Sequence, residues 1–371
     1  MISFIHGADF HLDSPFSGLP PEQAAKRRAE QRSLFASLAS LSEDVDLILL
    51  AGDLFDGERV YPETIECIRQ TLAQIQVPVF IAPGNHDWLS RQSPYRQVDW
   101  PAHVHIFQSE AITSVALPEL GCVVHGAGYL SPECHDSLLE GFHAAKEDGM
   151  FHLMVLHGEV NGGVGPYCPI TKEEIAKSNL HYLALGHIHQ YSGYQAAGDT
   201  VYAWPGCPQG RGFDELGEKG ILRGRIGEAG VHLEWTPIAV HRYWEKTISL
   251  SLEEEPLQTI LDALPEHTED DIYRIILTGE SEVDGVDLDR LYKALSPRFY
   301  HVILRDKSFV QRDLWARAEE DTLTGLFLKM MQKKWEHVKT EQERVQIDKA
   351  VRFGLAALEG REDPMGKGSQ K

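Results

Sequence analysis

Acidic, amide and imidazole side chains follow five apolar stretches of the sequence. Each stretch has the length of a buried strand, and the motifs at their ends are ADFH, GDLFD, GNHD, LHGE and GHIH. The candidate metal ligands in these motifs are Asp9, His11, Asp53, Asn85, His86, Asp87, His157, His187 and His189. Burying a carboxylate such as Asp53 is unfavourable unless a cation meets it. We therefore expect metal ions at the strand ends.

The ligand types favour two divalent cations. Two such ions about 3.5–4 Å apart repel each other and need an anionic bridge, and Asp53 is the candidate for that bridge. Asp9, His11 and His189 would complete one site, whereas Asn85, His157 and His187 would complete the other. Two dications less two carboxylates leave a charge near +2, which attracts a phosphate group even on an acidic protein.

His86 and Asp56 have expected roles other than metal binding. His86 lies between Asn85 and Asp87, where it could act as general acid or electrostatic helper. Asp56 follows Asp53 by three residues, and its carboxylate could orient the His86 imidazole.

Each motif alone has a common structural explanation. An Asp-x-His pair arises often by chance, GHIH can be a core or capping pair, and GNHD can be a turn. Five such motifs in this order, each after an apolar strand, are much harder to explain in that way. The weakest of them is LHGE with His157, because it is the shortest signal.

Strands and helices alternate over the first 240 residues, which indicates an α/β domain whose sheets can pack face to face. The expected strands are residues 2–9, 45–53, 77–87, 103–107, 121–126, 152–158, 182–189, 200–206, 221–226 and 230–238. The expected helices are residues 21–42, 62–76, 137–146 and 173–178. Because the carboxyl ends of the strands line the crevice in open α/β folds, the candidate ligands can converge there. Glycines at 52, 84, 158 and 186 allow the backbone to approach a crowded centre.

The pattern changes after residue 240. Residues 241–310 predict a small domain of β-α-β-α-β order, and residues 311–360 predict a helical tail. The first tail helix has an apolar face made of Leu323, Leu326, Phe327, Met330, Trp335 and Val338, and the second carries Ile347, Val351, Leu355 and Leu358. The polar end, residues 361–371, is expected to be disordered.

The net charge of −21 disfavours long-range attraction of nucleic acid. Residues 301–371 hold 14 basic and 12 acidic side chains, so the acidic surplus lies in the remainder of the chain. A nucleic-acid substrate would need positive potential from bound metal, from local patches or from a partner subunit.

Composition also bears on location. The five cysteines are odd in number and form no CxxC pair, which suits free thiols in a reducing cytoplasm. No stretch approaches the roughly 20 apolar residues that span a bilayer, and the first residues lack the features of a signal peptide. We expect a cytoplasmic protein without a membrane segment.

The motif set resembles the calcineurin-like metallophosphoesterase superfamily over residues 1 to about 240. The stretch PGCPQGRGFDELGEKG (205–220) is similar to a signature of SbcD-type DNA-repair nucleases, with Cys207 where they usually have serine. GDLFD matches the bacterial branch of that group, and within it the chain looks most similar to the YhaO-like branch. The resemblance implies a β-sandwich flanked by helices, a small α+β capping domain and a helical C-terminal tail.

The resemblance also implies an activity. Two manganese ions would occupy the two ligand groups, and His86 would be the catalytic histidine. Such enzymes cleave DNA as 3′→5′ exonucleases and single-strand endonucleases, through in-line attack on phosphorus by water that the metals activate. They form homodimers, and their tail helices bind a coiled-coil ABC-type ATPase like SbcC. One departure is the acidic capping region: residues 241–300 hold 6 basic and 14 acidic side chains.

Two other functions use the same residues. A small-molecule phosphodiesterase or phosphomonoesterase would keep the metal centre, and an acidic surface would not hinder it. A non-catalytic scaffold for an ATPase partner would not need the full ligand set. Phosphoprotein phosphatases are disfavoured, because their GD-x-x-D-R-G and GNHE are here GDLFDGE and GNHD. The apolar face of the tail could either pack on the protein's own body or dock to a partner.

Overall fold

The computed structural model describes residues 1–17, 19–145, 149–281, 286–310, 315, 317–338 and 340–358. The chain divides into two compact units. Unit 1 contains Met1–Lys246, Glu266–Arg274 and Leu295–Ile303, and unit 2 contains Thr247–Pro265, Ile275–Ala294 and Leu304–Lys371. All the candidate metal ligands belong to unit 1. The end predicted to be disordered, residues 361–371, lies outside the described residues.

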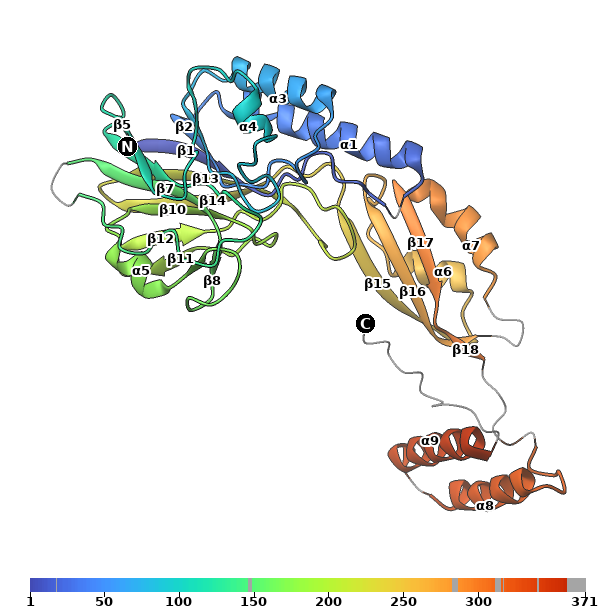
Figure 1. Ribbon diagram of the computed structural model, residues 1–371. Helices are drawn as coiled ribbons and strands as arrows, with labels where there is room; N and C mark the ends of the chain where they lie inside the picture. Colours follow the sequence, from blue (N-terminus) through green and yellow to red (C-terminus); the bar gives the residue numbers. More distant parts are fainter. Residues whose placement is uncertain are drawn as a thin grey trace. The chain divides into compact units, whose positions relative to one another are not determined.

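The first sheet of unit 1 has six strands in the order β14-β13-β1-β2-β3-β4 (Figure 1). Their bounds are β1 Ile2–Gly7, β2 Leu47–Leu50, β3 Val79–Ile81, β4 Val104–Ile106, β13 Gly220–Gly227 and β14 Gly230–Pro237. Strands β1 to β4 are parallel, whereas β13 is antiparallel to both of its neighbours. The parallel strands therefore end at one edge of the sheet.

The second sheet also has six strands, in the order β11-β12-β10-β7-β6-β5. Their bounds are β5 Thr113–Leu117, β6 Cys122–Gly126, β7 Phe151–His157, β10 Tyr182–Gly186, β11 Gln195–Ala197 and β12 Thr200–Ala203. The four central strands are parallel, and the two edge strands are antiparallel. A separate two-stranded sheet pairs β8 (Glu159–Val160) with β9 (Pro169–Ile170).

The two six-stranded sheets pack face to face, as expected for a metallophosphoesterase sandwich. Side chains alternate between the two faces of each strand. Phe4 of β1 and Leu49 of β2 face the second sheet and share one core with Leu153 of β7 and Tyr182 of β10. The next residue of β1, Ile5, belongs instead to the outer core. Both faces of the central strands are thus buried, which explains their continuous apolar sequence.

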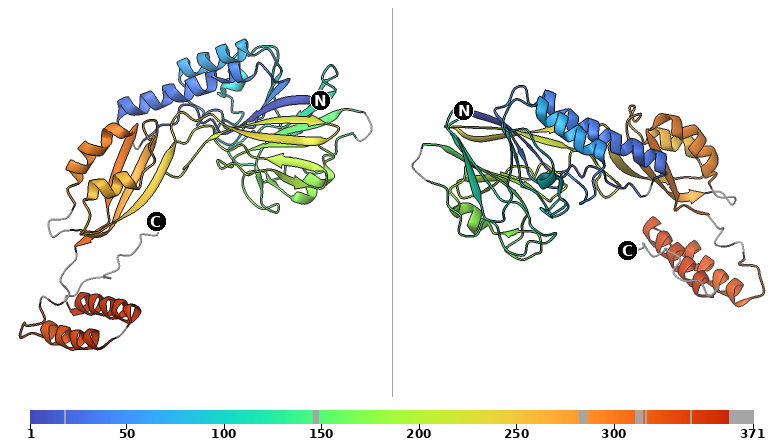
Figure 2. Two further views of the ribbon diagram at one scale, coloured as in Figure 1. Left: turned by 180° about the vertical axis from the view of Figure 1, so that it is seen from behind. Right: turned by 45° about the horizontal axis from the view of Figure 1, so that its top comes forward.

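Helices cover the outer faces of both sheets (Figures 1 and 2). The bounds are α1 Pro21–Ala36, α2 Leu38–Leu41, α3 Pro62–Gln74, α4 Pro94–Gln97 and α5 Lys172–Lys177. Phe35 and Leu72 pack from α1 and α3 against the first sheet, and Ile175 packs from α5 against the second. The single helix predicted for residues 21–42 is interrupted at Ser37, whose hydroxyl donates to the Leu34 carbonyl oxygen at 2.6 Å.

The helix predicted for residues 137–146 is wrong over the described residues 137–145, which form a turn at 138–141 followed by irregular chain. Its apolar residues suggested a helix, but Leu139 and Ala144 are buried in the outer core of the second sheet. The Ala144 backbone N–H donates to the Ser178 carbonyl oxygen at 2.8 Å. Gly141 has a φ of 69°, a conformation that a helix does not contain. Tertiary contacts therefore decide the backbone here.

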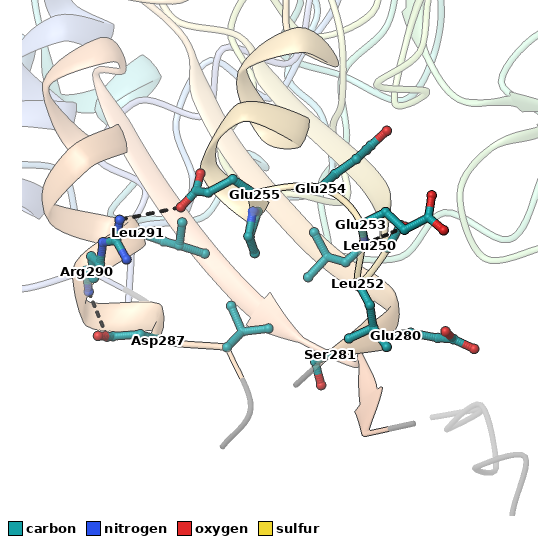
Figure 3. A pocket seen from close by; sticks show the side chains of 13 residues that line it. Leu250, Leu252, Glu253, Glu254, Glu255, Glu280, Ser281, Asp287, Arg290 and Leu291 are labelled. Carbon is teal, nitrogen blue, oxygen red and sulfur yellow. Dashed lines mark hydrogen bonds and ion pairs between the residues drawn. The ribbon is translucent and has the colours of Figure 1, made fainter. Parts of the chain in front are cut away.

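A third sheet has the strand order β15-β16-β17, with β18 paired to β16. The bounds are β15 Tyr243–Leu250, α6 Pro256–Asp262, β16 Ile272–Ser281, α7 Leu288–Leu295, η1 Ser296–Arg298, β17 His301–Asp306 and β18 Phe309–Val310. In unit 2 a pocket of about 440 Å³ is lined by the apolar side chains of Leu250 and Leu291, among others. Carboxylates of Glu253, Glu255 and Glu280 surround it (Figure 3). This acidic pocket is unsuited to binding a phosphate backbone.

The tail forms two helices, α8 (Leu323–His337) and α9 (Glu341–Leu358). Leu328 and Val351 are buried between them, with Phe327 and Met331 packed alongside. The predicted apolar face of α8 is therefore divided: Phe327 is part of this core. Trp335 and Val338 are half-buried, whereas Leu323, Leu326 and Met330 are exposed by 57–70%. No helix in the described part of the chain is long and apolar enough to cross a bilayer.

Candidate metal centre

Strand register brings the candidate ligands to the same edge of unit 1. Gly7 of β1 pairs with Leu50 of β2, and Leu50 pairs with Ile81 of β3. Asp9, Asp53 and Asn85 follow these paired residues within four positions. In the second sheet, His157 at the end of β7 pairs with Gly186 at the end of β10. His187 and His189 come directly afterwards.

The backbone at these strand ends is strained. Four of the seven predicted ligands have a positive φ: Asp9 (54°), His11 (44°), Asp53 (52°) and His187 (97°). Residues other than glycine adopt this region rarely, and such strain collects at functional sites. The Asp9 N–H donates to the Gly52 carbonyl oxygen at 3.0 Å, and the His11 N–H donates to the Asp53 carbonyl oxygen at 2.9 Å. These bonds hold the first two loops together.

Asp9, His11 and His189 form the first ligand group, with ligand atoms all within 4.8 Å of one another. The Nε2 atoms of His11 and His189 lie 3.1 Å apart. In His11, the other ring nitrogen, Nδ1, donates to the Asp56 carboxylate at 2.9 Å. In His189, Nδ1 donates to the Glu215 carboxylate at 2.7 Å. Both Nε2 atoms therefore carry lone pairs that face each other. Two nitrogen ligands about 2.1 Å from one ion, at a right angle, would be about 3 Å apart.

Asn85, His157 and His187 form the second group. The Asn85 side-chain oxygen lies 2.9 Å from His157 Nε2 and 3.2 Å from His187 Nδ1. His157 donates its Nδ1 proton to the Ala51 carbonyl oxygen at 2.9 Å, and His187 donates its Nε2 proton to Glu159 at 2.9 Å. The ring nitrogens that face the Asn85 oxygen therefore carry lone pairs, as in the first group. One amide oxygen and two imidazole nitrogens in this arrangement are suitable ligands for a divalent cation.

Asp53 links the two groups. Its Oδ2 lies 3.7 Å from His11 Nε2 and 3.4 Å from His157 Nε2. Its other oxygen accepts from the His86 backbone N–H at 2.9 Å. Asp53 also belongs to a group with Asp9 and His157 whose ligand atoms lie within 4.8 Å. One carboxylate thus stands where a bridge between two ions is required.

Burial shifts the pKa values of four predicted ligands so that their neutral forms are favoured. Burial raises the pKa of Asp9 to about 8, although nearby His189 opposes the rise. Burial also raises the pKa of Asp53 to about 8, and the Asp87 carboxylate adds to the rise. Burial lowers the pKa of His157 and of His187 to about 4. Neutral imidazoles beside buried carboxylates are the donor set of a divalent metal site.

His86 lies at the exposed side of the centre, with 43% of its side chain accessible. Its ring packs edge-on against His11, with centroids 4.7 Å apart. The expected pairing of Asp56 with His86 is the longer contact: Asp56 Oδ1 lies 3.9 Å from His86 Nδ1 but 2.9 Å from His11 Nδ1. Asp56 therefore orients His11 in this structure.

Asp87 holds the loops beside the predicted ligands through hydrogen bonds. Its two carboxylate oxygens accept from the backbone N–H groups of Gly84 at 2.7 Å and Leu54 at 2.7 Å, and from the Tyr95 hydroxyl at 2.6 Å. The carboxylate joins the loop after β2 to the loop after β3. It thereby places Asp53 and Asn85 beside each other.

Sequence reasoning missed three charged residues of the site: Glu159, Arg211 and Glu215. Glu159 is the last residue of LHGE, and the other two lie in the stretch 205–220. Hydrogen bonds from His189 and Arg211 outweigh burial and hold the pKa of Glu215 well below its usual value. The expectation that a metal-binding histidine donates its other N–H to a carboxylate could have identified both glutamates.

Two glycines are required for close packing at the centre. A side chain at Gly186 would place its Cβ 1.8 Å from the Ala51 carbonyl oxygen. A side chain at Gly84 would place its Cβ 2.3 Å from Asp53 Oδ1. Either contact would push the two sheets or the two loops apart, so only glycine fits.

The sandwich and its convergent histidines and carboxylates define a metal-dependent phosphoesterase centre. The model of the calcineurin-like phosphoesterase family matches residues 2–191, which is just over half of the chain and includes every candidate ligand. The chain belongs to this family. It is similar to the uncharacterized metallophosphoesterase YhaO of Bacillus subtilis (strain 168), with 34% identity over 260 residues, 66% of this chain and 62% of the relative. The matched region thus spans less than two thirds of that relative.

Proposed function

We propose that this protein is a two-metal phosphodiesterase that acts on DNA, as a 3′→5′ exonuclease and single-strand endonuclease in DNA repair. The observation that carries the proposal is the meeting of two ligand groups at Asp53. His11 and His157 approach the same carboxylate oxygen from opposite groups. The family to which the chain belongs uses divalent metals for phosphoester hydrolysis.

Two ions, manganese in our proposal, would be held by Asp9, His11 and His189 on one side, by Asn85, His157 and His187 on the other, and by Asp53 between them. Such ions activate water and neutralise phosphoryl oxygens. The protein contributes four histidines whose tautomers are set by Asp56, Glu215, Glu159 and the Ala51 carbonyl oxygen. Because these four rings are already oriented before substrate binds, the site needs less reorganisation during catalysis.

His86 is the proposed general acid. Its ring is accessible to substrate, unlike the rings of His11 and His157, which are fully buried. Its Nδ1 lies 3.4 Å from the Asp56 carbonyl oxygen, which leaves Nε2 to face the solvent side. As an imidazolium, with Nδ1–H held by that carbonyl oxygen, His86 would give its Nε2 proton to the leaving oxygen and become neutral.

The DNA substrate is supported by the stretch 205–220, which resembles the SbcD-type signature and supplies Arg211 and Glu215 to the centre. The acidic remainder of the chain weighs against tight binding of DNA by this protein alone. We therefore propose that it acts as a cytoplasmic homodimer in complex with an SbcC-like coiled-coil ATPase. Residues 241–310 would form the capping domain and residues 311–360 the docking tail.

The exposed residues Leu323, Leu326 and Met330 favour docking through α8. They lie three to four positions apart, so they form one stripe on the helix. Leu326→Glu together with Met330→Glu should abolish co-purification with the ATPase encoded in the same organism. Glu336→Lys, an exposed charge change on a different face of the same helix, should have no effect. Equal recovery of all three proteins would remove this role from α8.

Two alternatives use the same site. A small-molecule phosphodiesterase or phosphomonoesterase is favoured by the acidic surface, which does not hinder a small substrate. A non-catalytic scaffold is disfavoured, because the strained backbone at four ligands has no purpose without the centre.

End-labelled DNA and p-nitrophenyl phosphate esters distinguish these functions. With Mn²⁺, the wild-type protein should shorten the labelled DNA, and His86→Ala should lose about 10²–10⁴-fold in rate. His135→Ala is the matched control, because His135 is an exposed histidine in unit 1 that pairs with Glu133. Hydrolysis of the esters with intact DNA would favour the small-molecule enzyme. Inactivity on both substrates, with or without the ATPase, would favour the scaffold.

A further inference from the structure

The loop between β12 and β13 lies against the first ligand group. It contains two buried residues, Cys207 and Lys219, that bond to the backbone of His189. The Cys207 N–H donates to the His189 carbonyl oxygen at 3.2 Å, and Lys219 Nζ donates to the same oxygen at 3.3 Å. Neither contact reaches the imidazole. The ring is held instead by two charged residues in the middle of the loop.

Arg211 and Glu215 connect the two histidines of this group. Glu215 Oε1 accepts from His189 Nδ1 at 2.7 Å and from Arg211 Nη2 at 2.8 Å. Arg211 Nη1 donates to Asp56 Oδ1 at 3.0 Å, and the same oxygen accepts from His11 Nδ1 at 2.9 Å. The result is a continuous chain of contacts through Asp56, Arg211 and Glu215 that begins at one imidazole and ends at the other.

We propose that Arg211 and Glu215 are positioning residues for the divalent ion of His11 and His189, and that Arg211 does not bind the substrate phosphate. The inference rests on the proposed metal use of the centre. An arginine beside a phosphoesterase site would ordinarily be assigned to the substrate. The contacts of this arginine lead to the opposite assignment.

The guanidinium of Arg211 is already engaged by carboxylates. Nε and Nη2 both donate to Glu215, and Nη1 donates to Asp56. The Arg211 backbone N–H also donates to Glu215 Oε2 at 2.7 Å, which fixes the turn of the loop. Only 23% of the side chain is exposed. A phosphate could recruit Arg211 only by displacing the carboxylates that orient both histidines.

A purely electrostatic role and a positioning role of Arg211 predict opposite effects of Arg211→Met on the affinity for the divalent ion. Loss of a cation beside the ion would by itself strengthen ion binding. Loss of the link between Asp56 and Glu215 would release both imidazoles and weaken it. We expect the weaker binding, by about 10- to 100-fold, the usual effect of losing a residue that orients a metal ligand.

Glu215 offers the complementary comparison. Glu215→Ala removes the charge and the acceptor, whereas Glu215→Gln removes the charge but keeps an oxygen that can accept the His189 Nδ1 proton. Positioning predicts about 10- to 100-fold weaker ion binding in Glu215→Ala and near wild-type binding in Glu215→Gln. A purely electrostatic role predicts that both variants weaken equally.

Calorimetric titration of the metal-free full-length protein with Mn²⁺ tests the proposal. The wild-type protein should bind two ions, and Arg211→Met and Glu215→Ala should weaken one of them while the other is unchanged. Arg223→Met is the matched control, because Arg223 pairs with Asp44 and its side chain is 25% exposed. Thermal unfolding in chelator verifies that each variant is folded. If Glu215→Ala does not fold, Glu215→Asp replaces it, because the shorter side chain keeps the charge but withdraws the oxygen from His189 Nδ1. If Arg211→Met does not fold, Arg211→Lys replaces it, because one ammonium group cannot join Asp56 to Glu215. Both replacements should weaken one Mn²⁺ site.

The Michaelis constant at saturating Mn²⁺ distinguishes positioning from substrate binding. We expect Arg211→Met to leave it within about twofold of the wild-type value. A tenfold rise, or two unchanged Mn²⁺ sites in both Arg211→Met and Glu215→Ala, would overturn the proposal and leave the proposed function intact. A wild-type protein that binds no Mn²⁺ would overturn the proposed function itself, and this inference with it.

Discussion

His11 and His189 face each other through Nε2 atoms 3.1 Å apart, and each ring gives its only proton to a carboxylate on the opposite side. Two lone pairs at that distance repel each other unless a cation lies between them. The same arrangement recurs where His157 and His187 face the Asn85 oxygen. Both arrangements are those expected of groups that could hold a metal ion.

Metal removal should destabilise the protein. An ion that binds only the folded state, at 100 times its dissociation constant, adds about 2.7 kcal/mol per site. With both sites filled, we expect Mn²⁺ to raise the melting temperature of the chelator-treated protein by about 10–20 °C, at about 2–4 °C per kcal/mol. Differential scanning calorimetry measures this shift. An identical melting temperature with and without Mn²⁺ would contradict it.

The metal-free protein should lose stability as pH rises from about 6.5 to 8. The pKa of Asp9 and of Asp53, about 8 in the folded chain, lies above the unfolded value, so folding holds protons that rising pH removes. His157 and His187, whose pKa is lowered to about 4, act in the opposite direction but only below about 6.5. We expect a loss on the order of 1–4 kcal/mol by urea denaturation. Saturating Mn²⁺ should abolish it, and constant stability in chelator would refute the explanation.

Asp53→Asn should affect both metal sites, whereas Asn85→Ala should affect one. Asp53 contacts a histidine of each group, and Asn85 contacts histidines of the second group only. Equilibrium dialysis with elemental analysis should find fewer than one ion per chain in Asp53→Asn and about one in Asn85→Ala. In chelator at pH 8, Asp53→Asn should melt above the wild-type protein, because an uncompensated buried charge is gone. Equal metal loss in the two variants would argue against the shared carboxylate.

Gly186→Ala should destabilise the fold by about 3 kcal/mol or more, at the upper end of single substitutions. The added methyl group would lie 1.8 Å from the Ala51 carbonyl oxygen, which belongs to the other sheet. Gly57→Ala is the control, because a Cβ at that position meets nothing within 4 Å. Chemical denaturation measures both. Similar stability of the two variants would show that the sheets can separate at this point without a penalty.

The central strands could be predicted because both of their faces are buried, so Leu47–Leu50 and Tyr182–Gly186 read as continuous apolar runs. The edge strand β5 was not predicted. Its residues are exposed or half-buried, and Ser114 and Ala116 carry no strand signal. The predicted helix at 137–146 failed for the reverse reason, because its apolar residues serve the core of the second sheet.

The metal-binding role of the seven residues stays a prediction, but their proximity could be predicted, because each lies at the end of a strand or within four positions after it and parallel strands end at one edge. Glu159, Arg211 and Glu215 act on the ligands through hydrogen bonds, and their spacing in sequence does not reveal this. Arg211 and Glu215 lie more than 20 residues from His189, in a loop whose path only the fold determines. Whether the Asp56 carboxylate pairs with His11 or with His86 likewise depends on the positions of the side chains in the folded protein.

Anomalous diffraction from a crystal grown with Mn²⁺ tests the central claim most directly. The account predicts two peaks about 3.5–4 Å apart, one beside His11 and His189, the other beside His157 and His187, with Asp53 between them. A single peak, or two peaks that Asp53 does not join, would contradict it.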